Sequence, residues 1–465
     1  MTPQPSRSSD QPAPSRGEPR ELTLAVGAPA HGGHCVARPV DDPGGRVIFV
    51  RHALPGETVR ARLTEMTSRT WRADAVEILQ ASPDRVESVW PEAGPAGVGG
   101  GELAHVALDA QRTWKRWVLA DCLRRIGGQE VADAVAALPE ASAAAAVPIE
   151  PMPTDAAAQA SNSARRRALA GTATRTRVSL TVGEDGRPGM HAFRSGTVLP
   201  LRRLPLAVDA ITEIGLLERS RWRAHYRPGM RIEAIAPSGG EPVVLLDERL
   251  LTAQARSTGR RRVREVVDAS ALGLGELTYS VHAEGFWQVH VDAPRVLVER
   301  VVRGALGADL DGAAGSRVLE LYSGAGLFTL PLAALVGSGG EVVSLEGNEQ
   351  AVRDARRTLH DQPSARLASG RVSARSVREL AGSLTGGRPD VVVLDPPRQG
   401  AGREVIEAVG ALGAERIVLV ACDPAALARD LGTLLRSGYA LGSMSALDMF
   451  PHTHHFETIA VLERS

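Results

Sequence analysis

Short apolar runs that end at a polar or glycine-rich segment recur through the last third of the chain. Val318–Leu332 passes from an apolar run through Ser-Gly-Ala-Gly into a second apolar stretch, which is the pattern of a strand, a tight turn and a helix. Further apolar runs follow at Val342–Leu345, Asp390–Leu394 and Arg416–Ala421. Because runs of four to eight apolar residues alternate with helical patterns, we predict an α/β domain with a Rossmann-like sheet over residues 281–465.

The N-terminal region has a different pattern, in which apolar and polar residues alternate between Gly and Pro turns. His31–Pro39, Gly45–Arg51, Leu54–Glu57 and Trp71–Ile78 carry this alternation, which is typical of short antiparallel strands. These segments resemble a TRAM module, a small β-barrel of the oligonucleotide-binding (OB) type. We therefore predict an OB-like barrel over residues 18–82. Arginines expected on its surface could contact phosphates or serve only solubility; they are Arg38, Arg51, Arg60, Arg62, Arg69 and Arg72.

The rest of the chain carries weaker signals. Residues 1–17 are rich in Pro, Ser and Arg and should form a disordered tail. Residues 83–280 are predicted to form a central domain of mixed α/β character, with strands at Thr176–Val182 and Arg231–Ala236. We expect this domain to help to hold RNA. Within it, Pro148–Ala160 is expected to be a low-complexity joint.

Composition excludes a globally basic protein, since 54 basic and 54 acidic residues balance. Local basic patches remain possible because the field at a cleft depends on arrangement. The basic residues are arginines apart from Lys115. Neither a run of 18 apolar residues nor a secretory signal pattern is present, so we expect a cytoplasmic protein without a membrane partner. Nothing in the sequence predicts a protein partner.

Two glycines and a carboxylate suggest a nucleotide-type ligand. Gly324 and Gly326 follow the first strand, and Glu346 ends the second strand 22 positions after Gly324, near the spacing of about 20 at which such folds place an acid on ribose hydroxyls. The glycines do not complete the dinucleotide fingerprint of three. An adenosine ligand without a pyrophosphate, such as S-adenosylmethionine, therefore fits better, although an ordinary turn remains the alternative.

Cys422 lies where the strand pattern of Arg416–Ala421 gives way to a helix pattern. The chain has only three cysteines, Cys35, Cys122 and Cys422, so neither a disulfide framework nor a paired metal motif is evident. Cys422 is therefore a candidate nucleophile. The alternative is a small buried residue at a strand end.

Five ordered segments together resemble the RNA uracil-C5 methyltransferases, which form 5-methyluridine in tRNA and ribosomal RNA. They are Gly285–Val289, Glu320–Gly326, Asp395–Arg398, Cys422–Asp430 and His452–Glu457. The resemblance implies transfer of a methyl group from S-adenosylmethionine to carbon 5 of a uridine in structured rRNA or tRNA. It also implies that Cys422 adds to carbon 6 and that Glu457 later accepts the proton from carbon 5.

The same resemblance assigns the cofactor site. It places Gln288, Tyr322 and Asp395 at the methyl donor, together with Gly324, Gly326 and Glu346. Taken alone, Gln288 could be a helix start, Tyr322 a core aromatic and Asp395 a turn cap. Taken alone, Glu457 could be merely a solvated carboxylate before the apolar strand that follows it. The histidines His452, His454 and His455 have no suitably spaced ligand partner, so no metal is expected.

Three departures from the family pattern stand out. Many relatives hold an iron–sulfur cluster on four cysteines after the TRAM module, whereas the corresponding stretch, Trp90–His105, has none. We therefore expect no iron–sulfur cluster. Leu327 stands where a polar residue is common, and Ser376 replaces the usual Asp at the third strand, which could weaken donor binding.

Two other functions remain open at this point. One is an RNA-binding or RNA-folding factor with a decayed methyltransferase domain. The other is a methyltransferase acting on a base nitrogen, for which Cys422 would be dispensable.

Overall fold

The computed structural model describes residues 20–141, 146–310 and 313–465. The tail predicted over residues 1–17 lies outside these residues. The chain divides into two compact units, one containing residues 34–83 with the strand before them and the other containing residues 84–465 with residues 31–33.

The first unit is the closed barrel predicted from the alternating pattern. Its strands follow the order β1-β2-β3-β5-β4, and residues such as Leu24, Ile48 and Val59 fill its interior. The strands are β1 (Glu21–Ala30), β2 (His34–Pro39), β3 (Ile48–Arg51), β4 (Thr58–Met66) and β5 (Trp71–Gln80).

One barrel arginine does not lie where we predicted. Arg51 is buried, because it stands beside Asp74 on the neighbouring strand. Its Nε and Nη2 atoms donate to the two carboxylate oxygens of Asp74, each at 2.8 Å. A buried guanidinium needs such a partner, so this arginine is unavailable to phosphates. Of the other predicted surface arginines, Arg72 is half-buried and the remaining four are exposed.

The second unit contains the predicted Rossmann-like sheet. Its strand order is β17-β16-β15-β18-β19-β21-β20-β6. The five strands from β17 to β19 run parallel, and β21 is inserted antiparallel between β19 and β20. The bounds are β15 (Arg317–Leu321), β16 (Glu341–Glu346), β17 (Ala365–Ser369), β18 (Val391–Leu394), β19 (Arg416–Ala421), β20 (Tyr439–Asp448) and β21 (Glu457–Arg464).

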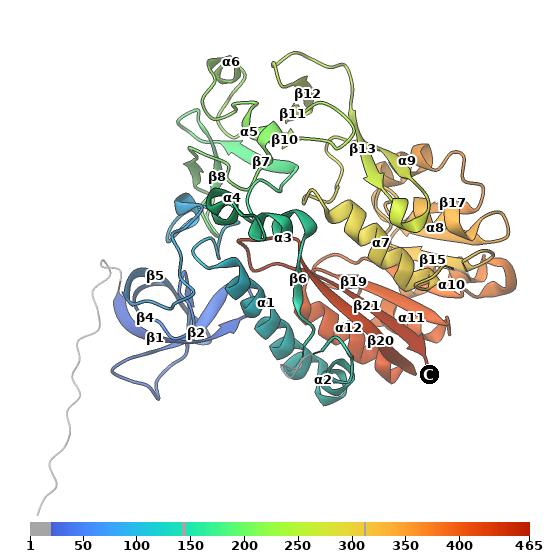
Figure 1. The fold of residues 1–465 in the computed structure, drawn as a ribbon, viewed down its shortest axis with the longest axis horizontal. Helices are drawn as coiled ribbons and strands as arrows, with labels where there is room; N and C mark the ends of the chain where they lie inside the picture. The colour runs from blue at the N-terminus through green and yellow to red at the C-terminus, as the bar shows by residue number, and fades with distance from the viewer. Residues whose placement is uncertain (1–19, 142–145, 311–312) are drawn as a thin grey trace, which may run out of the picture. The chain divides into compact units, whose positions relative to one another are not determined.

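Both faces of this sheet are covered, as its apolar strands require. On β15, Val318 packs into one core and Leu319 into the other, because successive side chains point to opposite faces. Helices α7 (Ala293–Leu306), α8 (Thr329–Val336) and α9 (Glu349–Thr358) cover the first face. Helices α10 (Ala374–Gly382), α11 (Arg403–Ala411) and α12 (Pro424–Arg436) cover the second. Figure 1 shows α7 and α12 on opposite sides of the strands.

A segment from the predicted central region completes this layer. Helices α1 (Leu108–Cys122) and α2 (Gln129–Ala136) pack against α12, and β6 (Ile149–Pro151) pairs in parallel with β20 at the edge of the sheet. The prediction of a low-complexity joint over Pro148–Ala160 is therefore wrong. Its residues form β6 and helix α3 (Pro153–Gln159), because Ile149 is apolar and buried against the sheet.

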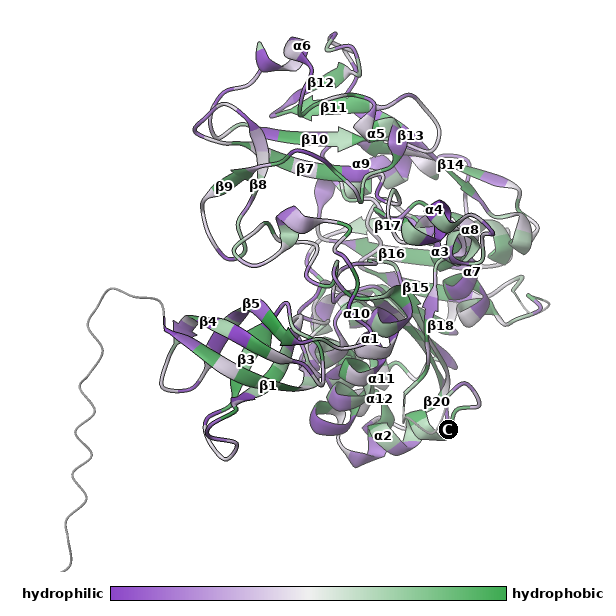
Figure 2. Cartoon of the chain, turned by 60° about the vertical axis from the view of Figure 1, so that its left-hand side comes forward, coloured by the Kyte–Doolittle hydropathy of each residue, from purple (hydrophilic) through white to green (hydrophobic). Residues whose placement is uncertain are grey.

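A second sheet has a core of its own. Its order is β12-β11-β10-β7-β8-β9, and Trp222, Ile232 and Val244 lie in its core. Figure 2 shows β11 in the hydrophobic colour. The predicted strands at 176–182 and 231–236 are confirmed as β7 and β10. The bounds are β7 (Arg177–Val182), β8 (Pro188–His191), β9 (Val198–Pro200), β10 (Arg231–Ile235), β11 (Val243–Leu246), β12 (Arg249–Thr252), α4 (Ala164–Ala168), α5 (Asp209–Thr212) and α6 (Ser220–Arg223).

A hairpin of β13 (Arg262–Asp268) and β14 (Glu276–His282) leads from this sheet to α7. Residues 83–280 thus contribute to three hydrophobic cores and to the hairpin. Among the described residues, none of the helices has the length and apolarity needed to span a lipid bilayer.

Candidate active site

A cavity of about 1280 Å³ lies at the carboxyl edge of the Rossmann-like sheet. It is flanked by the ends of β15, β16, β18 and β19, by the start of β21 and by residues 281–289. Ligands of open α/β sheets bind at this edge, where the strand order reverses. The predicted site residues that line the cavity are Gln288, Tyr322, Gly324, Glu346, Asp395, Cys422 and Glu457.

Glu346 is fixed by backbone donors. Its Oε2 accepts a hydrogen bond from the Gly324 N–H at 2.9 Å, and its Oε1 accepts one from Asn348 N–H at 2.6 Å. Gly324 has φ +55°, a conformation that glycine adopts without a steric penalty. The carboxylate that ends β16 is therefore tied directly to the glycine turn after β15, which joins two of the predicted cofactor residues into one structure.

Tyr322 holds an unusual backbone conformation at the end of β15. Its φ is +64°, although it carries a bulky side chain, and its N–H donates to Leu345 O at 2.8 Å. Such conformations persist where surrounding contacts enforce them, and they concentrate at functional sites. The turn thereby places the half-buried Tyr322 on the cavity wall.

Gly326 does not line the cavity, in contrast to its prediction as a cofactor contact. It has φ +86°, and its N–H donates to Ser323 O at 3.0 Å. A Cβ there would lie 3.4 Å from Ala355 Cβ on α9. Gly326 therefore shapes the turn and lets it pack closely on α9, and its role as a cofactor contact stays a prediction.

Sequence reasoning missed Asn348, which also lines the cavity. Its side chain caps α9 by accepting from Gln350 N–H at 2.9 Å and Ala351 N–H at 3.2 Å. An Asn followed by Glu-Gln after an apolar run is a helix-start signal, so the sequence did contain the information.

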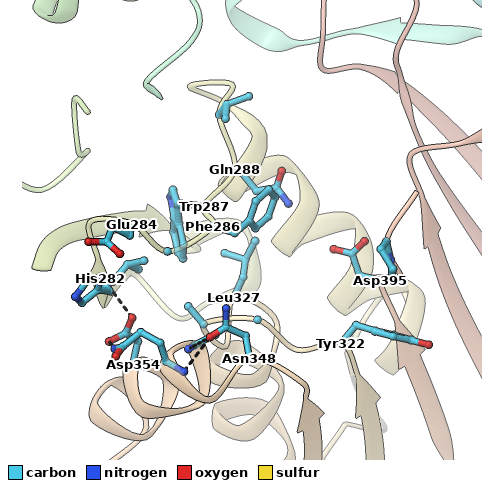
Figure 3. Close-up of a pocket in the computed structure, with 18 of the residues that line it drawn as sticks. His282, Glu284, Phe286, Trp287, Gln288, Tyr322, Leu327, Asn348, Asp354 and Asp395 are labelled. Atoms are coloured by element: carbon cyan, nitrogen blue, oxygen red, sulfur yellow. Dashed lines mark hydrogen bonds between the residues drawn. The ribbon is translucent and has the colours of Figure 1, made fainter. Parts of the chain in front are cut away.

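Gln288 lies on the extended segment before α7. Helix α7 begins at Ala293, so the reading of Gln288 as a helix start is wrong. Trp287 is buried against Tyr279, with ring centroids 5.1 Å apart, and Val289 O accepts a hydrogen bond from Thr176 N–H at 2.8 Å. These contacts on both sides hold the segment. Figure 3 shows Gln288, Tyr322 and Asp395, from three separate segments, around the same cavity.

Cys422 lies between β19 and α12, as the sequence predicted. Asp423 caps α12 by accepting from Ala425 N–H at 3.0 Å and Ala426 N–H at 2.9 Å, so the thiol lies just before the helix start. Burial raises the pKa of the Cys422 thiol to about 12, and the nearby Glu457 and Asp395 add to the increase while Arg398 opposes it. The thiol is therefore close to two carboxyl groups and one guanidinium.

The two carboxyl groups also affect each other. Burial raises the pKa of Asp395 to about 7. Burial and the neighbouring Asp395 raise the pKa of Glu457 well above its usual range, and Arg398 opposes this. Glu457 begins β21, and its Oε1 is buried without a hydrogen-bond partner among the described residues. That oxygen is available to a ligand in the cavity.

Leu327 and Ser376, the two departures from the family pattern that we predicted near the methyl donor, lie in different places. Leu327 lines the cavity. Ser376 does not, and its placement at the third strand is wrong, because β17 ends at Ser369 and Ser376 lies in the first turn of α10. There Ser376 and Ser373 form a reciprocal capping box.

The loop between β20 and β21 supplies another wall, from which Phe450, Thr453 and His455 line the cavity. Burial lowers the pKa of His455 to about 3, with His454 adding to the effect, so this imidazole is neutral. Neither His452 nor His454 lines the cavity.

The sheet and its cavity define a methyltransferase-type domain that carries a thiol beside two carboxyl groups at its ligand edge. Residues 275–465 match the family model described as tRNA (Uracil-5-)-methyltransferase, and residues 18–76 match the TRAM domain. An uncharacterized RNA methyltransferase of Streptomyces avermitilis is 38% identical, over 95% of this chain and 98% of its own. The 23S rRNA (uracil(1939)-C(5))-methyltransferase RlmD of Acinetobacter baumannii is 30% identical, over 94% of this chain and 92% of its own.

The fold also matches a solved structure. The tRNA (uracil-54, C5)-methyltransferase of Pyrococcus abyssi superimposes with a TM-score of 0.62 at 20% identity, over 94% of this chain and 99% of its own. The chain therefore belongs to the RNA uracil-C5 methyltransferases, the S-adenosylmethionine-dependent family that the five sequence segments had indicated. Its substrate is RNA.

Proposed function

We propose that this enzyme methylates carbon 5 of a uridine in structured RNA, with Cys422 as the nucleophile and Glu457 as the proton acceptor. The observation that carries the proposal is that Cys422, Asp395 and Glu457 line the same cavity as the glycine turn and Glu346. A donor and a base can therefore meet within one enclosed space.

The donor half of the cavity suits an adenosine. Glu346 is the carboxylate at the end of the second strand, where ribose hydroxyls bind in this class of fold, and Asn348 and Leu327 line the same region. Gln288 and Tyr322 would contact the methionine part. When bound, S-adenosylmethionine supplies an electrophilic methyl group.

Carbon 5 of uracil needs activation before it can accept that methyl group. The Cys422 thiolate would add to carbon 6, and the electrons of the C5=C6 double bond would shift onto carbon 5. Carbon 5 would then attack the methyl group as the sulfonium S–CH3 bond breaks, so that S-adenosylhomocysteine leaves. Arg398 is the group that favours the thiolate, because it opposes the rise in the Cys422 pKa. Asp395, as an acceptor, would hold the N3–H of the uracil imide edge.

Elimination completes the reaction. Glu457 removes the proton from carbon 5, the electrons of that C–H bond restore the C5=C6 double bond, and the C6–S bond breaks to release the Cys422 thiolate. The Oε1 atom of Glu457, which is buried without a hydrogen-bond partner in the described part of the chain, would take this proton. Its raised pKa matches the role, since a base must hold the proton it has taken.

For the RNA, the proposal is a ribosomal or transfer RNA. The Acinetobacter relative acts on 23S rRNA, so ribosomal RNA should be tested first. The barrel and the sheet of β7 to β12 would hold the RNA around a uridine that is flipped out of its stack. No protein partner is proposed.

We also propose that the enzyme works without an iron–sulfur cluster. The stretch that carries the cluster in many relatives is closed here by backbone hydrogen bonds, from Val98 N–H to Glu92 O at 2.9 Å and from Gly97 N–H to Gly94 O at 2.9 Å. A Cβ on Gly101 would lie 2.9 Å from a ring carbon of Trp90. Glycine thus lets the loop pack directly on the buried Trp90, a contact that stabilises the loop without thiolates.

The deciding experiment uses the purified protein, labelled S-adenosylmethionine and total RNA that lacks 5-methyluridine. The RNA is digested and the labelled nucleoside is identified. We expect 5-methyluridine from the wild type and none from Cys422→Ala. Label in a methylated adenosine or guanosine, or retained activity in Cys422→Ala, would overturn the Cys422 mechanism. RNA binding with no label would instead favour a decayed enzyme.

A further inference from the structure

The loop of residues 449–456 directly precedes Glu457, which lines the cavity. It joins β20 to β21, and three of its residues line the cavity beside Glu457. One of its residues, His452, has φ +65°. A non-glycine residue rarely adopts this left-handed conformation without surrounding contacts that enforce it.

Gln111 on α1 provides most of those contacts. Its Oε1 accepts a hydrogen bond from His452 N–H at 2.7 Å, and its Nε2 lies 3.1 Å from His452 Nδ1. The same Nε2 donates to Val106 O at 2.8 Å and Leu103 O at 3.1 Å. Leu103 N–H in turn donates to His452 O at 2.9 Å. The backbone of His452 is therefore bound on both its N–H and its C=O.

Lys115, one turn further along α1, binds the start of the same loop. It is fully buried, and its Nζ donates to Asp448 Oδ1 and, at 3.1 Å, to Phe450 O. Asp448 is the last residue of β20, and its neighbour Leu447 stands opposite Glu457 in the ladder. Lys115 and Gln111 therefore bind the loop at its beginning and at its middle.

The identity of Lys115 is informative. It is the one lysine among 54 lysine and arginine residues, so a chain that otherwise uses arginine has a lysine here. Burial lowers the pKa of its ammonium and Asp448 opposes this. A compact ammonium can satisfy one carboxylate and one carbonyl in a closed space, whereas the planar guanidinium fork needs more room and more acceptors.

We propose that Lys115 and Gln111 are positioning residues, which hold the 449–456 loop so that Glu457 faces the uracil adduct on Cys422. This inference rests on the proposed role of Glu457. Neither side chain lines the cavity, and both are fully buried. Their effect is confined to the step that Glu457 performs, the removal of the carbon 5 proton.

The test separates this step from the rest of the reaction. In a single turnover with labelled S-adenosylmethionine and substrate RNA, samples are denatured and the methylated RNA that remains covalently attached to protein is resolved on a gel. We expect Lys115→Met and Gln111→Leu to accumulate this adduct, with elimination slowed by about 10- to 100-fold, the range expected when a catalytic group is displaced by about 1 Å. Methyl transfer to RNA should change far less.

Leu119→Ala is the matched control. Leu119 lies on the same helix one turn after Lys115 and is fully buried, but it packs into the apolar core shared with α12, and its hydrocarbon side chain has no polar group with which to bind the loop backbone. It should lower the thermal midpoint of unfolding without raising the adduct fraction. A rise of the adduct in Leu119→Ala similar to that in Lys115→Met would show that general destabilisation, not positioning, is responsible.

A double variant gives a second readout. If Lys115 acts through Glu457, adding Lys115→Met to Glu457→Gln should slow elimination no further, whereas independent effects would multiply. Should Lys115→Met fail to fold, Gln111→Leu, which keeps the buried ion pair, decides the question. Wild-type adduct levels in folded Gln111→Leu would overturn the inference.

Failure of the proposed function would look different. Wild-type enzyme incubated with 5-fluorouridine-containing RNA should form a stable adduct that depends on Cys422, because fluorine cannot be removed as a proton. Absence of that adduct refutes the Cys422 mechanism itself. Its presence, together with unaltered elimination in both α1 variants, refutes only the positioning role.

Discussion

At the residue scale, the reactive groups lie in surroundings that oppose their ionisation. The pKa of Cys422 is raised to about 12 and that of Asp395 to about 7, chiefly by burial. Such shifts are frequent where burial and neighbouring charges are arranged for proton transfer. In the free enzyme the Cys422 thiol is therefore protonated, and the Asp395 carboxyl group is partly protonated near pH 7.

This arrangement predicts the direction of the pH dependence. A carboxyl group with a raised pKa stays protonated up to that pKa, and both Asp395 and Glu457 are proposed as acceptors. We therefore expect kcat/KM, which reports the free enzyme, to fall as the pH drops below 7, by about tenfold per unit where one proton controls the reaction. Steady-state assays from pH 5.5 to 8.5 measure this. A profile that is flat down to pH 5.5 would contradict it.

Replacing Glu457 gives a second prediction at this scale. Glu457→Gln cannot take the carbon 5 proton, while addition and methyl transfer need no such base, so a covalent protein–RNA adduct should accumulate. Denaturing gel electrophoresis detects it. The Cys422→Ala/Glu457→Gln double variant should show none, and a Glu457→Gln enzyme that turns over without an adduct would count against Glu457 as the base.

The positions of candidate site residues were predictable where a reactive residue type followed the end of a strand. Cys422, Asp395 and Glu346 each follow or end an apolar run, and all three line the cavity. Gln111 and Lys115 could not be found this way, because their partners His452 and Asp448 lie more than 300 positions away. Only the folded chain brings buried polar groups of such separation together.

At the element scale, the start of α9 shapes the donor half of the cavity. Asn348→Ala removes the side-chain acceptor for two backbone N–H groups and should weaken the helix start by about 1 kcal/mol. Hydrogen exchange followed by mass spectrometry should show faster exchange in the first turn of α9. Asn348→Asp, which keeps a capping oxygen, is the control, and equal exchange in both variants would contradict the capping role.

Four strands of the Rossmann-like sheet, β15, β16, β18 and β19, were predictable from apolar runs, whereas β17, with its mixed sequence Ala365–Ser369, and the helix after it were not. The prediction that Ser376 lies at the third strand relied only on the order of the family motifs along the chain. In the structure, Ser373 and Ser376 cap α10, and a Ser-x-x-Ser pair of this kind is a helix-start signal that outweighs the motif. The stretch around Pro148 was misread for another reason, since a three-residue edge strand shows no periodicity.

At the scale of the whole molecule, we expect binding of the methyl donor and binding of RNA to depend on different parts of the chain. The residues that line the cavity lie between Gly100 and Glu457, outside the barrel. Deleting residues 1–83 should therefore leave the affinity for S-adenosylhomocysteine unchanged by calorimetry, while RNA affinity falls on the order of tenfold, or about 1.4 kcal/mol. Equal loss of both affinities would show that the barrel supports the catalytic unit itself.

The edge strand β6 has a consequence for how the protein is made. Ile149 pairs with Ala446, and α1 binds the loop just before the last strand through Gln111 and Lys115. During synthesis the barrel has all of its strands once residue 80 has emerged, but α1 and β6 must wait for almost the whole remaining chain before their partners exist. The part of α1 that packs on α12 lacks its partner during that interval, so the catalytic half assembles after the barrel.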